Sequence, residues 1–158
     1  MKEFLFEDCS PRWKNVTSLI LRVIAGVIFF AHGYQKMFEG SGVTGVGGFF
    51  DSLGIPAPIF FAWVVTLVEL VGGAFLILGF LTKISGTLLS IDMLVATLLV
   101  HADNGIFVSD GGYEFTLILF AVAASLTMTG PGKLAIDNIL FKKREIDTVG
   151  MSGEAEQI

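Results

Sequence analysis

Five polar residues in and beside long apolar stretches are the candidates for chemistry: His32, Lys36, Glu69, His101 and Glu114. His32 and Lys36 are four residues apart, so they share one face of a helix. An imidazole and an ammonium group on one face can donate hydrogen bonds to an anion or to a ligand oxygen. The two glutamates can relay protons, or pair with these donors and orient them.

The composition around these residues indicates a membrane protein. The chain has 158 residues, of which 53% are hydrophobic and only 16% charged, against about 25% charged in a soluble domain. Ionisable residues inside membrane helices are costly, which makes Glu69 and Asp92 candidates for function. Both also fit a structural role, as neutral or helix-bridging groups. For Asp92, the hydroxyls within reach along the helix are those of Ser85, Ser90 and Thr97.

Four apolar segments are long enough to cross a bilayer, at residues 16–37, 60–81, 84–101 and 112–129. The second of these segments is the most apolar, and its insertion free energy outweighs the cost of one carboxylate. The fourth is the weakest, so Glu114 is expected at the membrane interface rather than in hydrocarbon.

The segment between the first two spans is expected to lie on the membrane surface. Phe49, Phe50 and Leu53 recur at helical spacing, which is typical of a short amphipathic helix. Pro56 and Pro58 end this helix and turn the chain inward. The fold class is therefore all-α, an integral membrane four-helix bundle with a short interfacial helix between spans 1 and 2.

The expected organisation is one membrane domain, residues 16–132, between two polar cytoplasmic segments, residues 1–15 and 133–158. A tight turn at Thr82-Lys83 is expected to join the second and third spans. The end of the chain is expected to be an amphipathic stub followed by a disordered tail.

Positive charges flank the spans mainly on one side. That side carries Lys2, Arg12, Lys14, Lys83, Lys133, Lys142, Lys143 and Arg144. The other side carries only Lys36, so both termini are expected in the cytoplasm of a multi-pass protein of the cell (inner) membrane. His32, Lys36, His101 and Glu114 then lie in the outer half. Arg22 lies towards the cytoplasmic side, where it is expected to reach lipid phosphate.

Several kinds of site are disfavoured. Cys9 is the only cysteine, which excludes an intrachain disulfide, a CxxC centre and a thiolate metal cluster. His32 and His101 could together ligate haem, but two histidines are a weak signal and no metal site is expected. No serine stands on a nucleophile elbow, and no glycine-rich loop has the ending that cradles phosphate. Basic patches with interleaved aromatic residues are absent, so nucleic acid is not an expected partner.

A series of short motifs, taken in order, resembles the DoxX family of small membrane proteins. The first motif consists of Arg22, Gly26, Phe29, His32, Gly33 and Lys36. The further matches are Leu53-Gly54-Ile55-Pro56 with Pro58, Glu69 with Gly72-Gly73, Leu78-Gly79, Met93-Leu94-Val95-Ala96, His101 with Asn104-Gly105 and Phe107, Gly111-Gly112-Tyr113-Glu114, and Gly130-Pro131-Gly132 with Asp137. The motifs together, rather than any one of them, carry the resemblance.

The resemblance implies a four-helix membrane bundle. Some members of the family are subunits of a thiosulfate:quinone oxidoreductase, and others are linked to membrane-associated redox or oxidative-stress complexes. By position, the family residues here are His32, Lys36, Glu69, His101 and Glu114. Asp92 matches no motif position, which lowers its claim to a role shared with the family.

The function expected is that of a multi-pass membrane subunit of a redox complex, handling a quinone or a small sulfur oxyanion. His32, Lys36 and His101 are then substrate-binding residues, while Glu69 and Glu114 act in proton relay or orientation. If the chain is an enzyme, it is an oxidoreductase subunit rather than a stand-alone enzyme, with quinone as its candidate cofactor. The expected partners are the lipid bilayer and other proteins of the complex, and a homo-oligomer stays open. The alternatives are a membrane scaffold that recruits soluble enzymes and a small transporter.

Overall fold

A computed structural model describes residues 11–140, and the regular structure in that range is entirely helical. The helices are α2 (Pro11–Phe38), α3 (Gly42–Ser52), α4 (Pro58–Leu78), α5 (Thr82–Ala96) and α6 (Glu114–Thr129). A π-helical turn, Thr97–His101, continues α5, and 3-10 turns follow at Ala102–Asn104 and Val108–Asp110. The all-α class is thus confirmed. Residues 1–10 and 141–158, which include much of both expected terminal segments, lie outside the described part of the chain.

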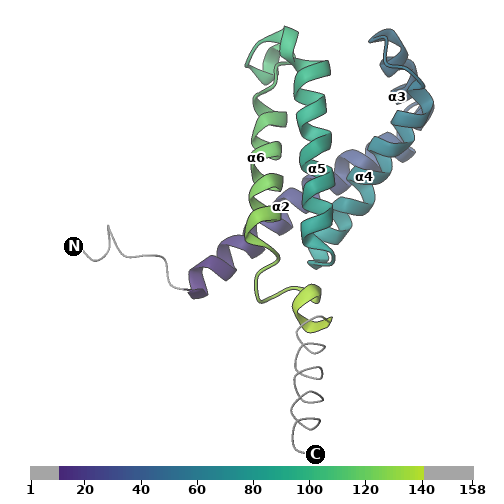
Figure 1. The fold of residues 1–158 in the computed structure, drawn as a ribbon. Coiled ribbons are helices and arrows are strands. Elements are labelled where there is room, and N and C mark those ends of the chain that lie inside the picture. The colour runs from purple at the N-terminus through teal and green to yellow at the C-terminus, as the bar shows by residue number, and fades with distance from the viewer. Residues whose placement is uncertain (1–10, 141–158) are drawn as a thin grey trace, which may run out of the picture.

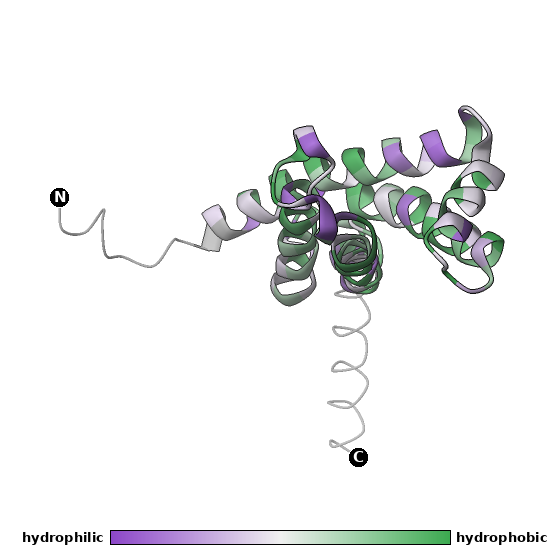
Figure 2. Ribbon diagram, turned by 90° about the horizontal axis from the view of Figure 1, so that it is seen from above, coloured by the Kyte–Doolittle hydropathy of each residue, from purple (hydrophilic) through white to green (hydrophobic). Residues whose placement is uncertain are grey.

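Three helical segments are long and apolar enough to cross a membrane: Asn15–Phe38, Pro58–Leu78 and Thr82–Asn104. The fourth apolar helix, α6, is shorter, at 16 residues. Large apolar side chains cover the outer faces of these helices, and Ile24, Leu98 and Ile118 are each more than half exposed. Apolar colouring dominates the long helices in Figure 2. Lipid is the environment that such a surface fits.

The helices pack mainly as two pairs, α2 along α4 and α5 along α6, and contacts between α4 and α5 join the pairs (Figure 1). Helix α3 packs against α4 and against the end of α2. We call the end that holds α3 and residues 102–113 the loop end. The opposite end, which holds residues 79–81 and 130–140, is the turn end (Figure 1). The candidate site lies towards the loop end.

Glycines set the spacing between α2 and α4. A Cβ atom at Gly33 would collide with the backbone of Leu70, and one at Gly73 would collide with the backbone of Phe30. A Cβ at Gly26 would lie 2.8 Å from the carbonyl oxygen of Gly73. Small residues at such positions allow membrane helices to approach backbone to backbone. This close approach places polar side chains of α2 and α4 within bonding distance.

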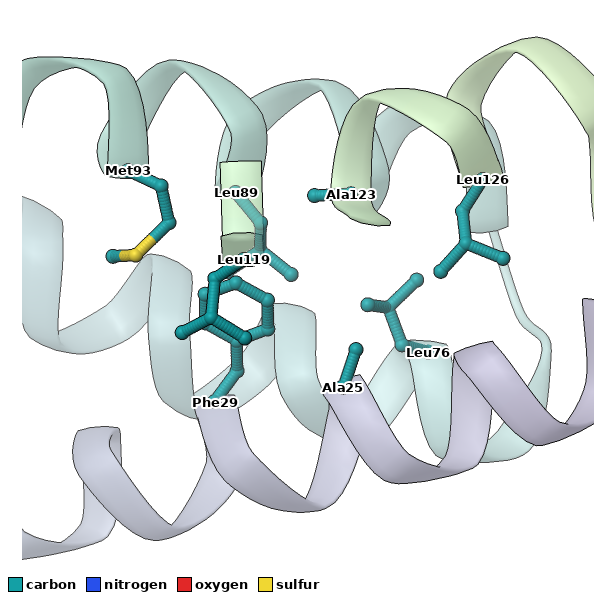
Figure 3. Packing of buried hydrophobic residues seen from close by; sticks show 8 residues of the cluster. All are labelled: Ala25, Phe29, Leu76, Leu89, Met93, Leu119, Ala123 and Leu126. Atoms are coloured by element: carbon teal, nitrogen blue, oxygen red, sulfur yellow. The ribbon is translucent and has the colours of Figure 1, made fainter. Parts of the chain in front are cut away.

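The buried core combines side chains from all four long helices. Its members are Ala25, Phe29, Leu76, Leu89, Met93, Leu119, Ala123 and Leu126 (Figure 3). Phe29, Leu76, Leu89 and Leu126 are fully buried. The core therefore ties both helix pairs into one body beneath the candidate site.

The turn between the second and third apolar helices lies a few residues earlier than expected. Helix α4 ends at Leu78, and Gly79 and Leu81 take left-handed φ angles of 68° and 47°. Thr82 and Lys83 are the first residues of α5. The prediction of a turn at Thr82-Lys83 is therefore wrong, because a carboxylate from far along the chain starts α5 there: Asp137 accepts hydrogen bonds from the N–H groups of Leu81 and Thr82 at 2.7 and 2.9 Å.

The prediction that Arg22 reaches lipid phosphate is also wrong. Its side chain is only 2% exposed, and its guanidinium donates to the carbonyl oxygens of Pro131 and Leu134 at 2.8 and 2.6 Å. The hydroxyl of Ser18 donates to the carbonyl of Gly130 at 2.9 Å. Residues 130–138 thus fold back over the start of α2 and complete the turn end, so this part of the expected tail is packed structure.

Candidate functional site

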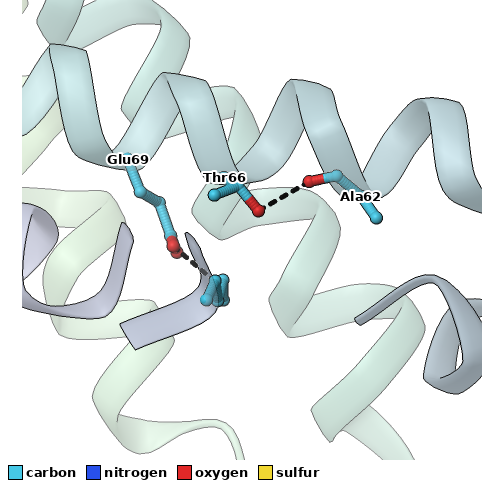
Figure 4. Close-up of polar contacts among 4 residues, drawn as sticks. Ala62, Thr66 and Glu69 are labelled. Carbon is cyan, nitrogen blue, oxygen red and sulfur yellow. Dashed lines mark hydrogen bonds and ion pairs between the residues drawn. The ribbon is translucent and has the colours of Figure 1, made fainter. Parts of the chain in front are cut away.

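An ion pair between Lys36 of α2 and Glu69 of α4 is the centre of the candidate site. The Lys36 ammonium donates to a Glu69 carboxylate oxygen at 2.5 Å, and the Glu69 side chain is only 3% exposed. Figure 4 shows Glu69 pointing from α4 towards the neighbouring helix, with Thr66 one turn earlier. Lys36 follows Gly33 by one helical turn, and Glu69 precedes Gly73 by one turn. The glycine contact therefore brings the two charges together.

A large cavity of about 800 Å³ lies beside this pair, between α3 and α4 on one side and α5 on the other. Its walls are mainly apolar and include Phe49, Phe50, Leu53, Phe61, Val65 and Leu99. Its ionisable lining residues are Lys36, Glu69, Asp92 and His101. A concave apolar space with a few convergent polar groups is the usual form of a small-molecule site.

A smaller cavity of about 280 Å³ lies between α2, α5, α6 and the loop after α5. It is lined by His32, Phe115 and Thr116, among others, and it shares Lys36, Glu69 and His101 with the large cavity. The ion pair and His101 therefore stand where the two cavities meet.

His101 is held in a defined orientation. It ends the π-helical turn Thr97–His101, and its Nδ1 lies 2.6 Å from the carbonyl oxygen of Gly111. A carbonyl oxygen can only accept, so Nδ1 carries the hydrogen and donates it. The neutral ring then has its lone pair on Nε2. π-helical turns inside α-helices are frequent at functional sites.

Asp92 is a site residue that the sequence motifs did not single out. It lines the large cavity together with Glu69, and its Oδ2 is buried with no hydrogen-bond partner among the described residues. Two of the three local hydroxyls are used elsewhere: Ser90 donates to the carbonyl of Thr87, and Thr97 to that of Met93. The signal in the sequence was an ionisable residue in the middle of an apolar segment. Only the tertiary structure shows that Asp92 lines a cavity.

The other two candidate residues lie further from the ion pair. His32 is exposed, lines the smaller cavity, and lies with its ring 5.9 Å from that of Phe115. Glu114 lines neither of these two cavities. Its carboxylate accepts from the backbone N–H of Val108 at 2.7 Å, which closes the loop before α6. The structure thus brings Lys36, Glu69 and His101 together, with His32 nearby and Glu114 apart.

Among the described residues, no three His, Cys, Asp or Glu side chains gather as metal ligands. His32 and His101 line the same small cavity, and the bond from Nδ1 of His101 to a backbone carbonyl leaves its Nε2 as the ring nitrogen open to a ligand.

Long apolar helices around a few buried ionisable groups define a small helical membrane protein. The sequence profile of the family described as DoxX matches residues 17–102, which is more than half of the chain. The chain belongs to the DoxX family, as its motifs indicated. No solved structure matches it significantly.

Relatives in several bacteria align over most of their length. The chain is 35% identical over 131 residues to "Putative oxidoreductase CatD" of Bacillus subtilis, covering 83% of this chain and 92% of that protein. It is 30% identical over 155 residues to "Uncharacterized membrane protein Rv3486" of Mycobacterium tuberculosis, covering 86% and 93%. It is 27% identical over 130 residues to "Inner membrane protein YqjF" of Escherichia coli, covering 82% and 96%.

Proposed function

We propose that this protein is a multi-pass membrane subunit of a redox complex and that it binds a quinone in the large cavity. The observation that carries the proposal is the cavity itself, about 800 Å³ of mainly apolar space with Lys36, Glu69, Asp92 and His101 in its wall. That volume lies within the range of small-molecule and cofactor sites. The printed name of the Bacillus subtilis relative, which calls it an oxidoreductase, points in the same direction.

The charges of the cavity favour a neutral quinone over a sulfur oxyanion. The positive charge of Lys36 is paired with Glu69, and Asp92 adds a second carboxylate to the same wall. An anion would therefore meet no net positive charge, and entering the apolar space would remove its hydration. A quinone has a flat apolar ring, an apolar chain and two oxygens, which suits aromatic walls and a few hydrogen-bonding groups.

Each polar residue then has a distinct role. An ammonium group has three donors, so Lys36 can bond Glu69 and still donate to a ring oxygen. Glu69 positions Lys36, and the Nε2 atom of His101 offers a further polar contact at the cavity wall. Glu114 acts at a distance, because it orders the loop whose Gly111 carbonyl holds His101.

The same proposal includes a topology. Helices α2, α4, α5 and α6 would cross the bilayer as a bundle, with α3 in the interface and both termini in the cytoplasm. Helix α6 is 16 residues long, about 24 Å at 1.5 Å per residue, against about 30 Å of hydrocarbon. The loop before α6 would complete that crossing. The side of the chain that is rich in lysine and arginine supports this orientation, which places the cavity in the outer half of the membrane.

The test is the small-molecule content of the protein purified in mild detergent, measured by mass spectrometry. We expect a quinone at near-stoichiometric amounts in the wild type and little in Glu69→Gln. The matched control is Glu39→Gln, since Glu39 is exposed near the end of α2 and does not line the cavity. A protein that carries no quinone, takes up none when it is added, and brings soluble enzymes down with it would contradict the proposal and favour the scaffold.

A further inference from the structure

Asp92 is unusual among the buried polar groups of the described residues. Three buried side-chain atoms there have no hydrogen-bond partner: Nε of Arg22, Oγ1 of Thr82 and Oδ2 of Asp92. The first two belong to the turn end, where Arg22 also makes two other bonds. Asp92 alone of the three lines the large cavity. The Asp92 side chain therefore borders a space that a ligand could fill, and one of its two carboxylate oxygens has no hydrogen-bond partner among the described residues.

A buried carboxylate oxygen without a hydrogen-bond partner does not contribute to stability. Burying a polar group without a hydrogen bond costs free energy, and a charge inside a membrane helix costs more. Ser90 and Thr97, which could have satisfied Asp92, donate to backbone carbonyls. Stability alone would favour leucine at this position. A carboxylate there is therefore a candidate for a functional role.

We propose that Asp92 is the residue that binds a ring oxygen of the ligand in the large cavity, an inference that rests on the proposed quinone site. An ionised carboxylate accepts a hydrogen bond from a hydroquinone hydroxyl, and a protonated one donates to a quinone carbonyl. One side chain can therefore hold either redox form. Lys36 on α2 and Asp92 on α5 line the cavity from different helices, so they offer two separate polar contacts to a ring that has two oxygens.

The test separates this binding role from a structural one by measuring stability and affinity together. Wild type, Asp92→Leu and Asp92→Asn are purified in detergent and then stripped of any lipid-soluble ligand that came with them. Thermal unfolding is recorded for each, and so is the affinity for decylubiquinone. The control ligand is an alkylbenzene with a chain of the same length and no ring oxygens, because it fills the apolar walls without using Asp92.

We expect Asp92→Leu to unfold at the same temperature as the wild type or a higher one, because it removes an unbonded carboxylate. Its affinity for decylubiquinone should fall about two- to tenfold, as for the loss of one hydrogen bond between neutral groups, because only a protonated carboxyl donates to a quinone carbonyl. Its affinity for the alkylbenzene should not fall. Asp92→Asn should retain most of the quinone affinity, because an amide both donates and accepts.

Two results would overturn the role of Asp92 while leaving the quinone site in place. One is a wild type and an Asp92→Leu variant that bind decylubiquinone equally well. The other is an Asp92→Leu variant that unfolds earlier or fails to fold, with Asp92→Asn restoring stability, since the carboxylate would then be a structural group. A wild type that binds neither ligand would overturn the proposed quinone site itself, and Asp92 with it.

Discussion

The protein uses a cation and a carboxylate at each end of its helical body, and it uses the two sets differently. At the turn end, Arg22 donates to backbone carbonyls, and Asp137 accepts from backbone amides at the start of α5. At the loop end, Lys36 and Glu69 bond each other beside two cavities. Charges that satisfy backbone groups hold the fold together, whereas charges that face a cavity are available to a ligand. Depth in the membrane alone does not separate these two roles.

Removing Arg22 should give the largest loss of stability. Arg22→Met keeps the apolar stem but leaves the carbonyls of Pro131 and Leu134 without donors. Both bonds come from a charged donor, and such bonds are worth about 1.5–3 kcal/mol each, so we expect the free energy of unfolding to fall by about 4 kcal/mol. Unfolding in detergent measures this fall, with Lys133→Met, at an exposed position, as the control. Equal losses in the two variants would show that Arg22 is not structural.

Separating the Lys36–Glu69 pair should cost slightly less stability, and the loss should be recoverable. Lys36→Met leaves a buried carboxylate without its partner, at an expected cost of about 3 kcal/mol. Adding Glu69→Gln removes the unpaired charge, so the double variant should regain most of that stability while quinone affinity stays low. A double-mutant cycle on unfolding free energies measures the coupling. Additive losses would mean that the two side chains do not interact.

Asp137→Asn should have an intermediate effect confined to the turn end. An amide offers one oxygen where the carboxylate offers two, so one of the bonds to Leu81 and Thr82 is lost, together with the charge at the start of α5. We expect a loss of about 1–2 kcal/mol in unfolding free energy and no change in quinone affinity. A fall in affinity at unchanged stability would contradict the separation of the two ends.

Glu114→Gln should have the smallest effect. The glutamine oxygen can still accept from the N–H of Val108, so the loop before α6 should stay closed. We expect a stability change within about 0.5 kcal/mol and unchanged quinone affinity. Hydrogen exchange of residues 106–113 reports whether the loop opens. A large loss of redox function in this variant, with the loop closed, would restore the relay role that the sequence suggested for Glu114.

The sequence predicted the helices well because hydropathy is a local property. Periods and lengths of apolar segments require only neighbouring residues, and the long apolar helices lie close to the expected spans. The sequence identified both residues of the ion pair as candidates, but it did not predict that they bond each other. That bond depends on the close contact between Gly33 of α2 and Leu70 of α4.

The errors all arose from contacts between distant residues. Arg22 bonds Pro131 and Leu134, which are more than 100 positions away in the chain, so no local pattern could distinguish a buried arginine from a snorkelling one. The start of α5 depends on Asp137 in the same way. For Asp92, the sequence shows only the hydroxyls nearby along the helix. Its environment is instead set by the large cavity between α5 and the pair α3 and α4.

The affinity of the purified protein for decylubiquinone tests the central claim most directly. It is measured in the wild type, in the Lys36→Met/Glu69→Gln double variant and in the Glu39→Gln control, each shown to be folded. The account predicts saturable binding in the wild type and control, and binding at least about tenfold weaker in the double variant. Equal affinity in all three proteins, or no saturable binding in any, would contradict it.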